Sequence, residues 1–463
     1  MMKVLFYADP TRLYETFARS ADVLADHLVN FMGAALLRSG KVELKAVVSA
    51  IAAWQCRGDA RFAGIELLPF GEEALLAVFP GCRSLEEMSR AFFRNELTEA
   101  GAAAFARRMG ELLHGWTPDV VIAFPTNFGP LRTLFPQALC LIAENGIVSR
   151  SPFPRALRFE PVEFLNGFAN RHADAIRALP VTDDDRRELA RLAEGIRRVI
   201  AARNPHRREM EAFRRRFRHT VLAPVPYANA YGESEWNDQY LWLTDVMTRL
   251  PRDIGVVATF HDNFGSQLNG RTAEHLAARF PNLLVSCGGG FRNQSLWFLP
   301  YVDATLNCET MTGFMGLLLG VPMIALDRVT SGWAANAVGL DAVVEALERP
   351  RADRAGALVW LLTRFTVLES RFDDADWYCR FLADKLAAFR KDGVTFDLMG
   401  PVERLGDVVD GILAALGATF ARFEAARAEK RRPLNRVLRK VGRHLAKLGD
   451  WLEACGSAET EDT

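Results

Sequence analysis

The sequence has few cysteines and no pattern that would join them. All seven lie far apart along the 463 residues, and no two form a C-x-x-C pair. An odd number of isolated cysteines argues against a disulfide framework and against a structural zinc site. Several fall in apolar runs, where a thiol packs as a small hydrophobic side chain. This usage fits a protein of the reducing cytosol.

Long hydrophobic runs and net charge are absent as well. No stretch approaches the ~18 consecutive apolar residues of a membrane span. The apolar run in the N-terminal MMKVLFYADP ends at Asp9, too early for a signal peptide. The 57 basic and 57 acidic residues cancel, which gives no global signal for a nucleic-acid partner. Any membrane association is therefore expected to be peripheral.

Short motifs for phosphate or metal binding are also missing. There is no G-x-x-x-x-G-K-[ST] and no G-x-G-x-x-G, and the three glycines at 288–290 lack dinucleotide-binding spacing. The eight histidines form no ligand-spaced cluster. The acidic runs at 183–185 and 373–376 precede helical patterns, so we interpret them as helix caps with first-turn acids. We expect no metal site and no separate cofactor.

The sequence does contain a regular alternation of strands and helices. Apolar runs separated by helical patterns predict parallel strands that are covered on both faces. The expected strands are residues 3–8, 42–50, 119–124 and 138–144 in the first half, and 220–227, 255–261, 282–287, 303–308 and 321–326 in the second. Such alternation is typical of right-handed βαβ units.

These two halves predict an α/β fold of two Rossmann-like domains that face a cleft. The chain is about three times the length of a typical domain, which leaves room for further segments. We assign residues 1–215 to an N-terminal domain, 216–350 to a second domain, 351–426 to C-terminal helices and 427–463 to a basic amphipathic tail. Ligands in open α/β sheets bind beyond the carboxyl ends of the strands.

The strongest candidate site follows the expected strand at 303–308. Glu309, Thr310 and Thr312 form a polar turn that leads through Gly313 into a helix. Such a helix start offers unpaired backbone N–H groups and a partial positive charge. The threonine hydroxyls add donors, and the glycine lets a ligand approach, so the turn suits a mono- or diphosphate. The alternative is that Thr312 only caps the helix.

This segment resembles the donor-binding segment of GT-B glycosyltransferases, and more closely that of bacterial capsule and surface-polysaccharide transferases of the Kdo-transferase type. The matching residues are Leu299-Pro300, Asp303, Glu309 to Gly313 and Gly320-Val321-Pro322. The resemblance implies a GT-B-like fold for the two Rossmann-like domains, and transfer of a sugar from a nucleotide-activated donor. Many retaining members carry a second glutamate on this helix, whereas residues 314–319 contain no acid. The stereochemical outcome therefore stays open.

Two further contacts with the donor are expected at strand ends of the second half. The resembled families place a lysine-x-histidine-proline motif here, and only His261 matches, because Thr259 and Asp262 stand at the lysine and proline positions. His261 could donate to phosphate or transfer a proton near neutral pH. The alternative is a strand-end histidine with ordinary hydrogen-bond partners. Tyr227 and Asn229, where the strand at 220–227 gives way to a loop, are expected to contact the nucleotide.

The first half supplies the candidate catalytic acids. Asp9 and Glu144 end the strands at 3–8 and 138–144. An inverting transfer needs a group that takes the proton of the acceptor hydroxyl, and these are the available carboxylates at the expected cleft. Each also fits a simple turn former. The arginine-rich loop at 150–158 could hold an anionic acceptor or donor.

The sequence thus predicts a metal-independent, cytoplasmic glycosyltransferase. Its partners would be a nucleotide-sugar donor and an acceptor that is a bacterial surface polysaccharide or a glycolipid. Two alternatives stay open, because a fold alone does not fix a function. One is a nucleotide-sugar 2-epimerase of the same fold, and the other is a non-catalytic GT-B-like subunit of a polysaccharide assembly machine.

The tail carries its own prediction. Residues 427–452 place leucines and valines at three- and four-residue steps, so that they share one helical face, with arginines and lysines around them. This pattern is typical of an interfacial helix that binds anionic lipid, and it would attach the protein peripherally to the inner membrane. The alternative is a helix that packs on the body or on a partner protein.

Overall fold

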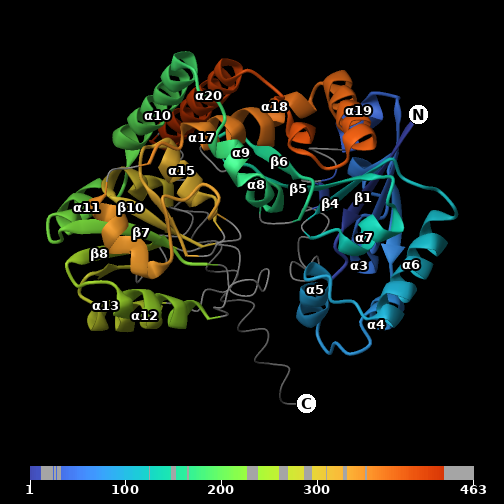
Figure 1. The fold of residues 1–463 in the computed structure, drawn as a ribbon, viewed down its shortest axis with the longest axis horizontal. Helices are drawn as coiled ribbons and strands as arrows, with labels where there is room; N and C mark the ends of the chain where they lie inside the picture. The colour runs from blue at the N-terminus through green and yellow to red at the C-terminus, as the bar shows by residue number, and fades with distance from the viewer. Residues whose placement is uncertain are drawn as a thin grey trace.

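The computed structural model describes residues 1–11, 24–25, 28, 33–124, 126–147, 153–163, 166–226, 238–259, 270–285, 295–308, 310–326, 331–349 and 352–431. Figure 1 shows two lobes side by side, each built on one sheet, with a layer of helices across the top. Within the described residues, every helix is too short or too polar to cross a bilayer.

The first lobe is built on a seven-stranded sheet. Its strands are β1 (Met2–Ala8), β2 (Val42–Ser49), β3 (Glu66–Phe70), β4 (Val120–Phe124), β5 (Leu139–Asn145), β6 (Ala156–Glu160) and β13 (Thr366–Leu368). They lie in the order β13-β6-β5-β4-β1-β2-β3. Strands β1 to β5 are parallel, whereas β6 runs antiparallel to both of its neighbours. All five residues of β4 are buried, as expected for a strand covered on both faces.

The second lobe repeats the arrangement with six parallel strands. These are β7 (His219–Pro224), β8 (Ile254–Thr259), β9 (Leu283–Leu284), β10 (Ala304–Asn307), β11 (Met323–Ala325) and β12 (Ala337–Val338). Their order is β12-β11-β10-β7-β8-β9. Numbered within each lobe, the second sheet follows the Rossmann order 3-2-1-4-5-6, and the first follows the same order with β13 added as a seventh strand beside β6. The predicted α/β architecture of two Rossmann-like lobes is therefore confirmed.

Helices cover both sheets and bridge them. The first lobe carries α2 (Ala34–Arg38), α3 (Ala50–Gln55), α4 (Glu72–Val78), α5 (Leu85–Phe93), α6 (Glu99–Leu113), α7 (Gly129–Leu134), α18 (Glu369–Phe372) and α19 (Ala375–Asp392). The second carries α11 (Arg207–Arg214), α12 (Gln239–Arg249), α13 (Gly270–Arg279), α14 (Ser295–Phe298), α15 (Thr312–Leu318) and α16 (Val343–Glu348). The bridging layer contains α8 (Gly167–Arg171), α9 (Ala173–Arg177), α10 (Asp183–Arg203), α17 (Ala355–Trp360) and α20 (Leu405–Arg431).

The two acidic runs lie at helix starts, as predicted. Thr182 and Asp185 form a reciprocal capping box at the start of α10, which satisfies backbone donors at that end. The Asp374 carboxylate accepts the N–H of Trp377 at the start of α19. Neither run needs a metal ion to explain its charge.

Three details differ from the sequence-based expectation. The segment 351–426, expected to be helical, also contributes the strand β13. Part of the arginine-rich segment 150–158, expected to be a loop, lies in strand β6, where Arg158 is buried. Strand β3 was not predicted, because its sequence ELLPF is short and contains a proline. A proline is tolerated there since β3 is the edge strand of its sheet.

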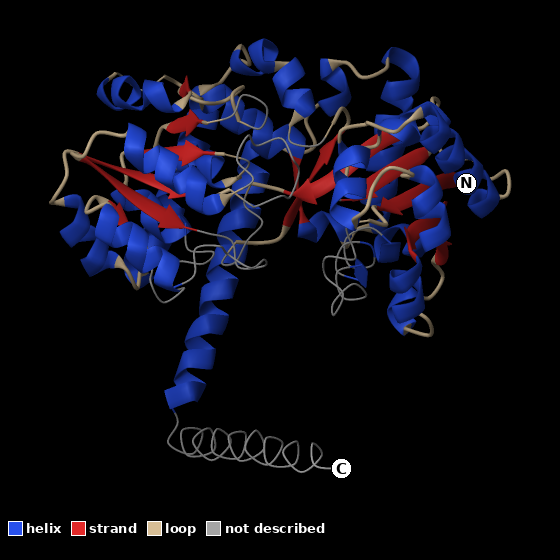
Figure 2. Ribbon diagram, turned by 90° about the horizontal axis from the view of Figure 1, so that it is seen from below, coloured by secondary structure: helices blue, strands red, loops and turns tan. Residues whose placement is uncertain are grey.

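The C-terminal part of the chain returns to the first lobe. Strand β13 pairs with β6, and the apolar face of α19 packs in the same core as β1, β2 and β4. Helix α20 lies along α10, and its residues Leu405, Val409, Ile412 and Leu416 are buried. Figure 2 shows that the far end of α20 extends beyond the body of the protein. The chain therefore crosses between the lobes twice, which ties them together.

A continuous apolar core spans the two lobes. It joins Leu222 and Val257 of the second sheet to Ala156 of the first through the bridging helices. Trp360, at the end of α17, is fully buried at its centre. Its ring stacks on Phe168 of α8 at 6.1 Å and meets Trp333 of the second lobe edge-on at 5.5 Å. This aromatic contact fixes how the lobes sit relative to one another.

Replacement of Trp360 should weaken both lobes at once. We expect Trp360→Ala to lower the free energy of unfolding by about 3–5 kcal/mol, because the side chain leaves a cavity in a shared core. The measurement is urea unfolding followed by far-UV circular dichroism. Trp54→Ala is the matched control, since Trp54 is 67% exposed and its loss should change stability by less than about 0.5 kcal/mol. Equal stability of the two variants would contradict this role of Trp360.

Candidate functional site

The order of the strands defines one candidate binding position in each lobe. In the first sheet the chain runs from β1 outward to β3 and then returns to place β4 on the other side of β1. In the second sheet it does the same around β7, with β10 on the returning side. Such switch points open a crevice at the carboxyl ends of the strands. In Figure 2 the strands of both sheets run toward the middle of the molecule, where the lobes meet.

The predicted phosphate turn lies at the switch point of the second sheet. Thr310 and Thr312 follow β10 and are half-buried. The Thr310 hydroxyl lies 3.1 Å from the Thr312 hydroxyl and accepts the backbone N–H of Thr312 at 3.3 Å. Thr310, and not Thr312 as the alternative interpretation had it, therefore caps one of the free donors of α15. The two hydroxyls form a polar pair at the end of β10.

The packing around residue 313 also explains why this residue is a glycine. Its N–H donates to the side-chain oxygen of Asn307 at 2.9 Å. A Cβ atom at this position would lie 2.3 Å from the sulfur of Met323 and 2.6 Å from Asn307, closer than real contacts allow. The glycine therefore lets α15 approach β10 and β11, and two of the backbone donors at this helix start already have protein partners.

Asp9 lies at the switch point of the first sheet. It is 1% exposed, and its N–H donates to the carbonyl of Phe124 at the end of β4. One carboxylate oxygen accepts both the N–H and the hydroxyl of Thr11, at 2.9 and 2.6 Å. Burial and, to a smaller extent, the Asp9 carboxylate raise the pKa of Tyr7 well above its usual value. The structure thus places Asp9 in a buried turn that its own side chain stabilises, as the turn-former alternative expects, and the catalytic role of Asp9 stays a prediction.

Glu144 belongs to a buried charged cluster that the sequence did not predict. It pairs across the strands with Arg158, and the two side chains form an ion pair in which Arg158 is buried and Glu144 retains 22% exposure. Arg158 also donates to the side chain of Asn166. Asn166 precedes α8 in the left-handed backbone region, at φ 70°. Arg158 is therefore a partner of Glu144 within the protein and not part of a solvent-exposed basic loop.

Glu160 is the second acid of this cluster. Its Oε1 atom accepts the N–H groups of Val162 and Phe168, at 2.8 and 3.0 Å. Its Oε2 atom is buried and has no hydrogen-bond partner among the residues that the structure describes. Burial raises the pKa of Glu160 to about 8, against the lowering effect of these N–H groups and of Arg158. The only sequence signal was a pair of charges at alternate positions of an otherwise apolar strand.

Four of the predicted site residues lie outside the described residues: Tyr227, Asn229, His261 and Glu309. Their roles stay predictions. Nearby, Thr259 ends β8 in a buried position, and its hydroxyl lies 2.7 Å from that of Ser295. The lysine position of the resembled motif is therefore occupied here by a buried hydroxyl that has a protein partner. In the described part of the chain, no three histidine, cysteine or acidic side chains group together as a metal site would require.

A line of aromatic rings connects the two candidate positions. The line begins at Phe168, which lies next to the cluster that contains Glu160 and Asn166. The ring of Phe168 stacks on the ring of Trp360. Trp360 contacts Trp333, which stacks on Phe314 of α15 at 5.4 Å. Because aromatic side chains in a core are closely packed and rigid, this line holds the start of α15 at a fixed distance from the Glu144 cluster.

No protein-family model matches the chain, and no curated protein matches it in sequence. Solved structures do resemble it. KpsC of Thermosulfurimonas dismutans, a beta Kdo 2,7 transferase, is 14% identical with a TM-score of 0.36, over 61% of this chain and 89% of KpsC. HepE of Anabaena, solved with UDP and glucose, is 12% identical with a TM-score of 0.34, over 84% of this chain and all of HepE.

A protein of a different activity gives a similar match. A putative UDP-N-acetylglucosamine 2-epimerase of Listeria monocytogenes is 12% identical with a TM-score of 0.28, over 91% of this chain and 97% of the epimerase. Similarities this weak add nothing to the strand order as evidence for the fold, and they do not separate transferase from epimerase.

The buried acid at 160 should make stability depend on pH. Between the unfolded value near 4.5 and the folded value of about 8, the folded protein keeps a proton on Glu160 that the unfolded chain has lost. Stability therefore falls as pH rises through this window, by up to about 1.4 kcal/mol per pH unit. We expect Glu160→Gln to flatten this fall in urea titrations between pH 5 and 8. Glu163→Gln, at an exposed position, should leave the wild-type slope, and parallel curves for Glu160→Gln and wild type would contradict the assignment.

Proposed function

We propose that this protein is a glycosyltransferase that moves a sugar from a nucleotide-sugar to a bacterial surface polysaccharide or a glycolipid. The observation that supports this is the pair of switch points, one in each lobe, with hydroxyl groups at one and carboxylates at the other. A bilobed protein with this arrangement can hold an activated donor against one sheet and an acceptor against the other. The transfer would be of the hexosyl or Kdo type.

The donor is assigned to the second lobe. The leaving group of a nucleotide-sugar is a phosphate, and its developing negative charge needs donors that are already in place. The hydroxyl of Thr312, which accepts from Thr310 and keeps its own proton, is such a donor beside Gly313. His261, Glu309, Tyr227 and Asn229 are proposed to complete the contacts with phosphate and nucleotide. These donors are proposed to stabilise the leaving group without a metal ion.

The proton acceptor is assigned to the first lobe. The ion pair with buried Arg158 orients the carboxylate of Glu144, which suits a group that binds a sugar hydroxyl. Asp9 is buried at the switch point of the first sheet, where one oxygen of its carboxylate accepts the hydroxyl of Thr11. We therefore propose Asp9 as the group that takes the proton and Glu144 as the group that orients the substrate.

The epimerase alternative predicts a different behaviour. An epimerase changes the donor sugar by itself, whereas a transferase consumes the donor only as an acceptor is glycosylated, apart from slow hydrolysis. A non-catalytic subunit would bind a donor or a glycan and convert neither. Incubation of the protein with labelled nucleotide-sugars, with and without acceptor, separates the three.

Donor binding and turnover should depend on different lobes. A matching nucleotide-sugar should raise the melting temperature, because a ligand of the folded state stabilises it by mass action. Among UDP-, GDP-, CMP- and TDP-sugars, one class should give this shift. Thr310→Val with Thr312→Val should weaken the binding of that nucleotide-sugar by about tenfold or more, or ~1.4 kcal/mol.

Asp9→Asn should keep donor binding and lower the transfer rate by at least about 100-fold.

The control for Asp9→Asn is Asp374→Asn. Asp374 also accepts a backbone N–H, at the start of α19, so the same loss of charge occurs away from the site. It should leave turnover unchanged. A chelating agent should also leave turnover unchanged. The proposal fails if no nucleotide-sugar shifts the melting temperature, or if Asp9→Asn and Asp374→Asn are equally active.

The basic tail is proposed to bring the enzyme to a lipid-linked acceptor. Residues 427–431 form the described end of α20, which extends away from the body, and residues 432–452 follow it in the sequence. Each basic group close to an anionic surface contributes on the order of 1 kcal/mol of attraction, which salt screens. The protein would thus be cytoplasmic and held reversibly at the inner membrane.

Vesicle binding tests the tail directly. The full chain should co-sediment with vesicles that contain phosphatidylglycerol at low salt, and it should be released at high salt. Replacing Arg436, Arg439, Lys440 and Arg443 by glutamine should abolish this binding. The same number of substitutions at exposed arginines of α10, such as Arg187 and Arg198, should not. Equal binding of both variants would show that the tail does not carry the attraction.

A further inference from the structure

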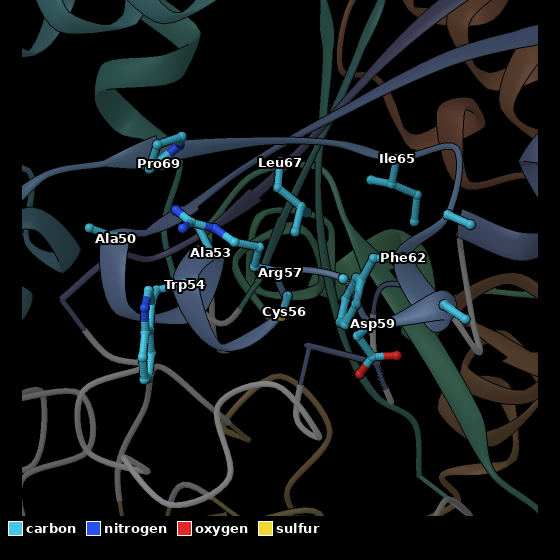
Figure 3. Close-up of a pocket in the computed structure, with 13 residues that line it drawn as sticks. Ala50, Ala53, Trp54, Cys56, Arg57, Asp59, Phe62, Ile65, Leu67 and Pro69 are labelled. Carbon is cyan, nitrogen blue, oxygen red and sulfur yellow. The ribbon is translucent and has the colours of Figure 1, made fainter.

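An open pocket lies at the outer edge of the sheet of the first lobe. It has a volume of about 700 Å³ and lies between α3 and the edge strand β3. Figure 3 shows the side chains that line it. Those that matter here are Ala50, Trp54, Arg57, Phe62, Leu67 and Pro69. Trp54 is 67% exposed, the largest exposure of any tryptophan among the described residues.

The pocket combines a flat apolar face with one uncompensated positive charge. Within the described residues Arg57 has no carboxylate partner, and its guanidinium extends between Trp54 and Pro69 in the view of Figure 3. The acid of the pocket, Asp59, is already engaged, because its carboxylate accepts from Nη2 of Arg61 at 2.6 Å and from Nε at 2.9 Å. The local charge available to a ligand is therefore positive.

These two features match the chemistry of an acidic sugar. The negative face of an indole attracts the weakly positive C–H groups on one side of a sugar ring. A guanidinium binds a carboxylate through two parallel N–H donors. A pyranose that carries a carboxylate offers both groups on one small molecule, whereas a neutral sugar would leave Arg57 unused.

The position of the pocket relates it to the transfer point. Ala50 follows directly on Ser49, the last residue of β2, and Ser49 pairs with Phe70 at the end of β3. Strand β2 lies next to β1, the strand that ends before Asp9. Neighbouring strands are ~4.8 Å apart. Ala50 and Pro69, which line the pocket near the carboxyl ends of β2 and β3, therefore lie one and two strands away from β1, at the same end of the sheet as Asp9.

We propose that this pocket binds an acidic sugar residue of the acceptor glycan, one or more units away from the hydroxyl that receives the new sugar. Trp54 stacks on the ring and Arg57 pairs with its carboxylate. This inference rests on the proposed function in one respect, because it takes the bound glycan to be the acceptor of the transfer reaction. The binding itself needs no donor and no turnover, and so it can be tested alone.

The probe is an oligogalacturonate, a chain of carboxylated sugars, with neutral cellotetraose as the uncharged comparison. Binding to the full-length protein without donor is measured by isothermal titration and by quenching of the exposed tryptophan. We expect the oligogalacturonate to bind and cellotetraose to bind at least about tenfold more weakly. Trp54→Ala and Arg57→Gln should each weaken oligogalacturonate binding about five- to tenfold. Trp54→Phe, which keeps an aromatic face, should retain most of it.

Matched controls separate the pocket from general surface charge. Arg38→Gln removes an exposed arginine from α2 of the same lobe and should not change binding. If Trp54→Ala and Arg57→Gln bind oligogalacturonate as tightly as Arg38→Gln, the proposal is overturned. It is also overturned if these two variants lose binding to phosphatidylglycerol vesicles but not to the saccharide, because the pocket would then contact lipid.

The outcome is independent of the proposed function. If no nucleotide-sugar binds but the saccharide binds at Trp54 and Arg57, the pocket stands and the transferase assignment falls. If donor binding and transfer are observed while all variants bind saccharide as the wild type does, only the pocket assignment falls.

Discussion

The contact between Phe168 and Trp360, with Trp333 on the far side of Trp360, is the constraint on which the rest of this structure depends. Each lobe has a sheet with its own cores, and two such sheets could be joined in many orientations. The rings of the bridging layer select one, because packed aromatic side chains leave few alternative arrangements. Phe314 extends the same line into α15. The interface between the lobes is thus part of the core and not a hinge of loops.

This constraint gives the two candidate half-sites a fixed relation. The polar turn at Thr310 and Thr312 begins the helix that carries Phe314, and the Glu144 cluster lies next to the start of α8, which carries Phe168. A shift in either helix would be transmitted through the rings between them. Catalysis by positioning requires reacting groups to be held close to their productive geometry. A rigid aromatic line between the half-sites is one way to meet that requirement.

The buried charges around Arg158 have a different role. An arginine that is almost fully inside the protein needs partners, and it has the Glu144 carboxylate and the Asn166 side chain. Glu160, close by, accepts two backbone N–H groups near the start of α8 and prefers its neutral form. The two acids come from neighbouring strands but have different partners: Glu144 pairs with the buried guanidinium of Arg158, whereas Glu160 is held by backbone N–H groups.

The sequence by itself determined the strand and helix alternation, the two-lobed α/β architecture and the helix starts at the acidic runs 183–185 and 373–376, because these follow from local periodicity and short-range hydrogen bonds. That Thr182 is the capping residue of the first of these helices came from the structure. It also indicated that Thr310 to Gly313 lie at a strand end. Only the tertiary structure decided that Arg158 is buried against Glu144, and that Gly313 is required by Asn307 and Met323. It also decided that residues 366–368 return to the first sheet. Each of these is a contact between residues or segments brought together by folding, and no local pattern specifies which strand becomes the neighbour of another.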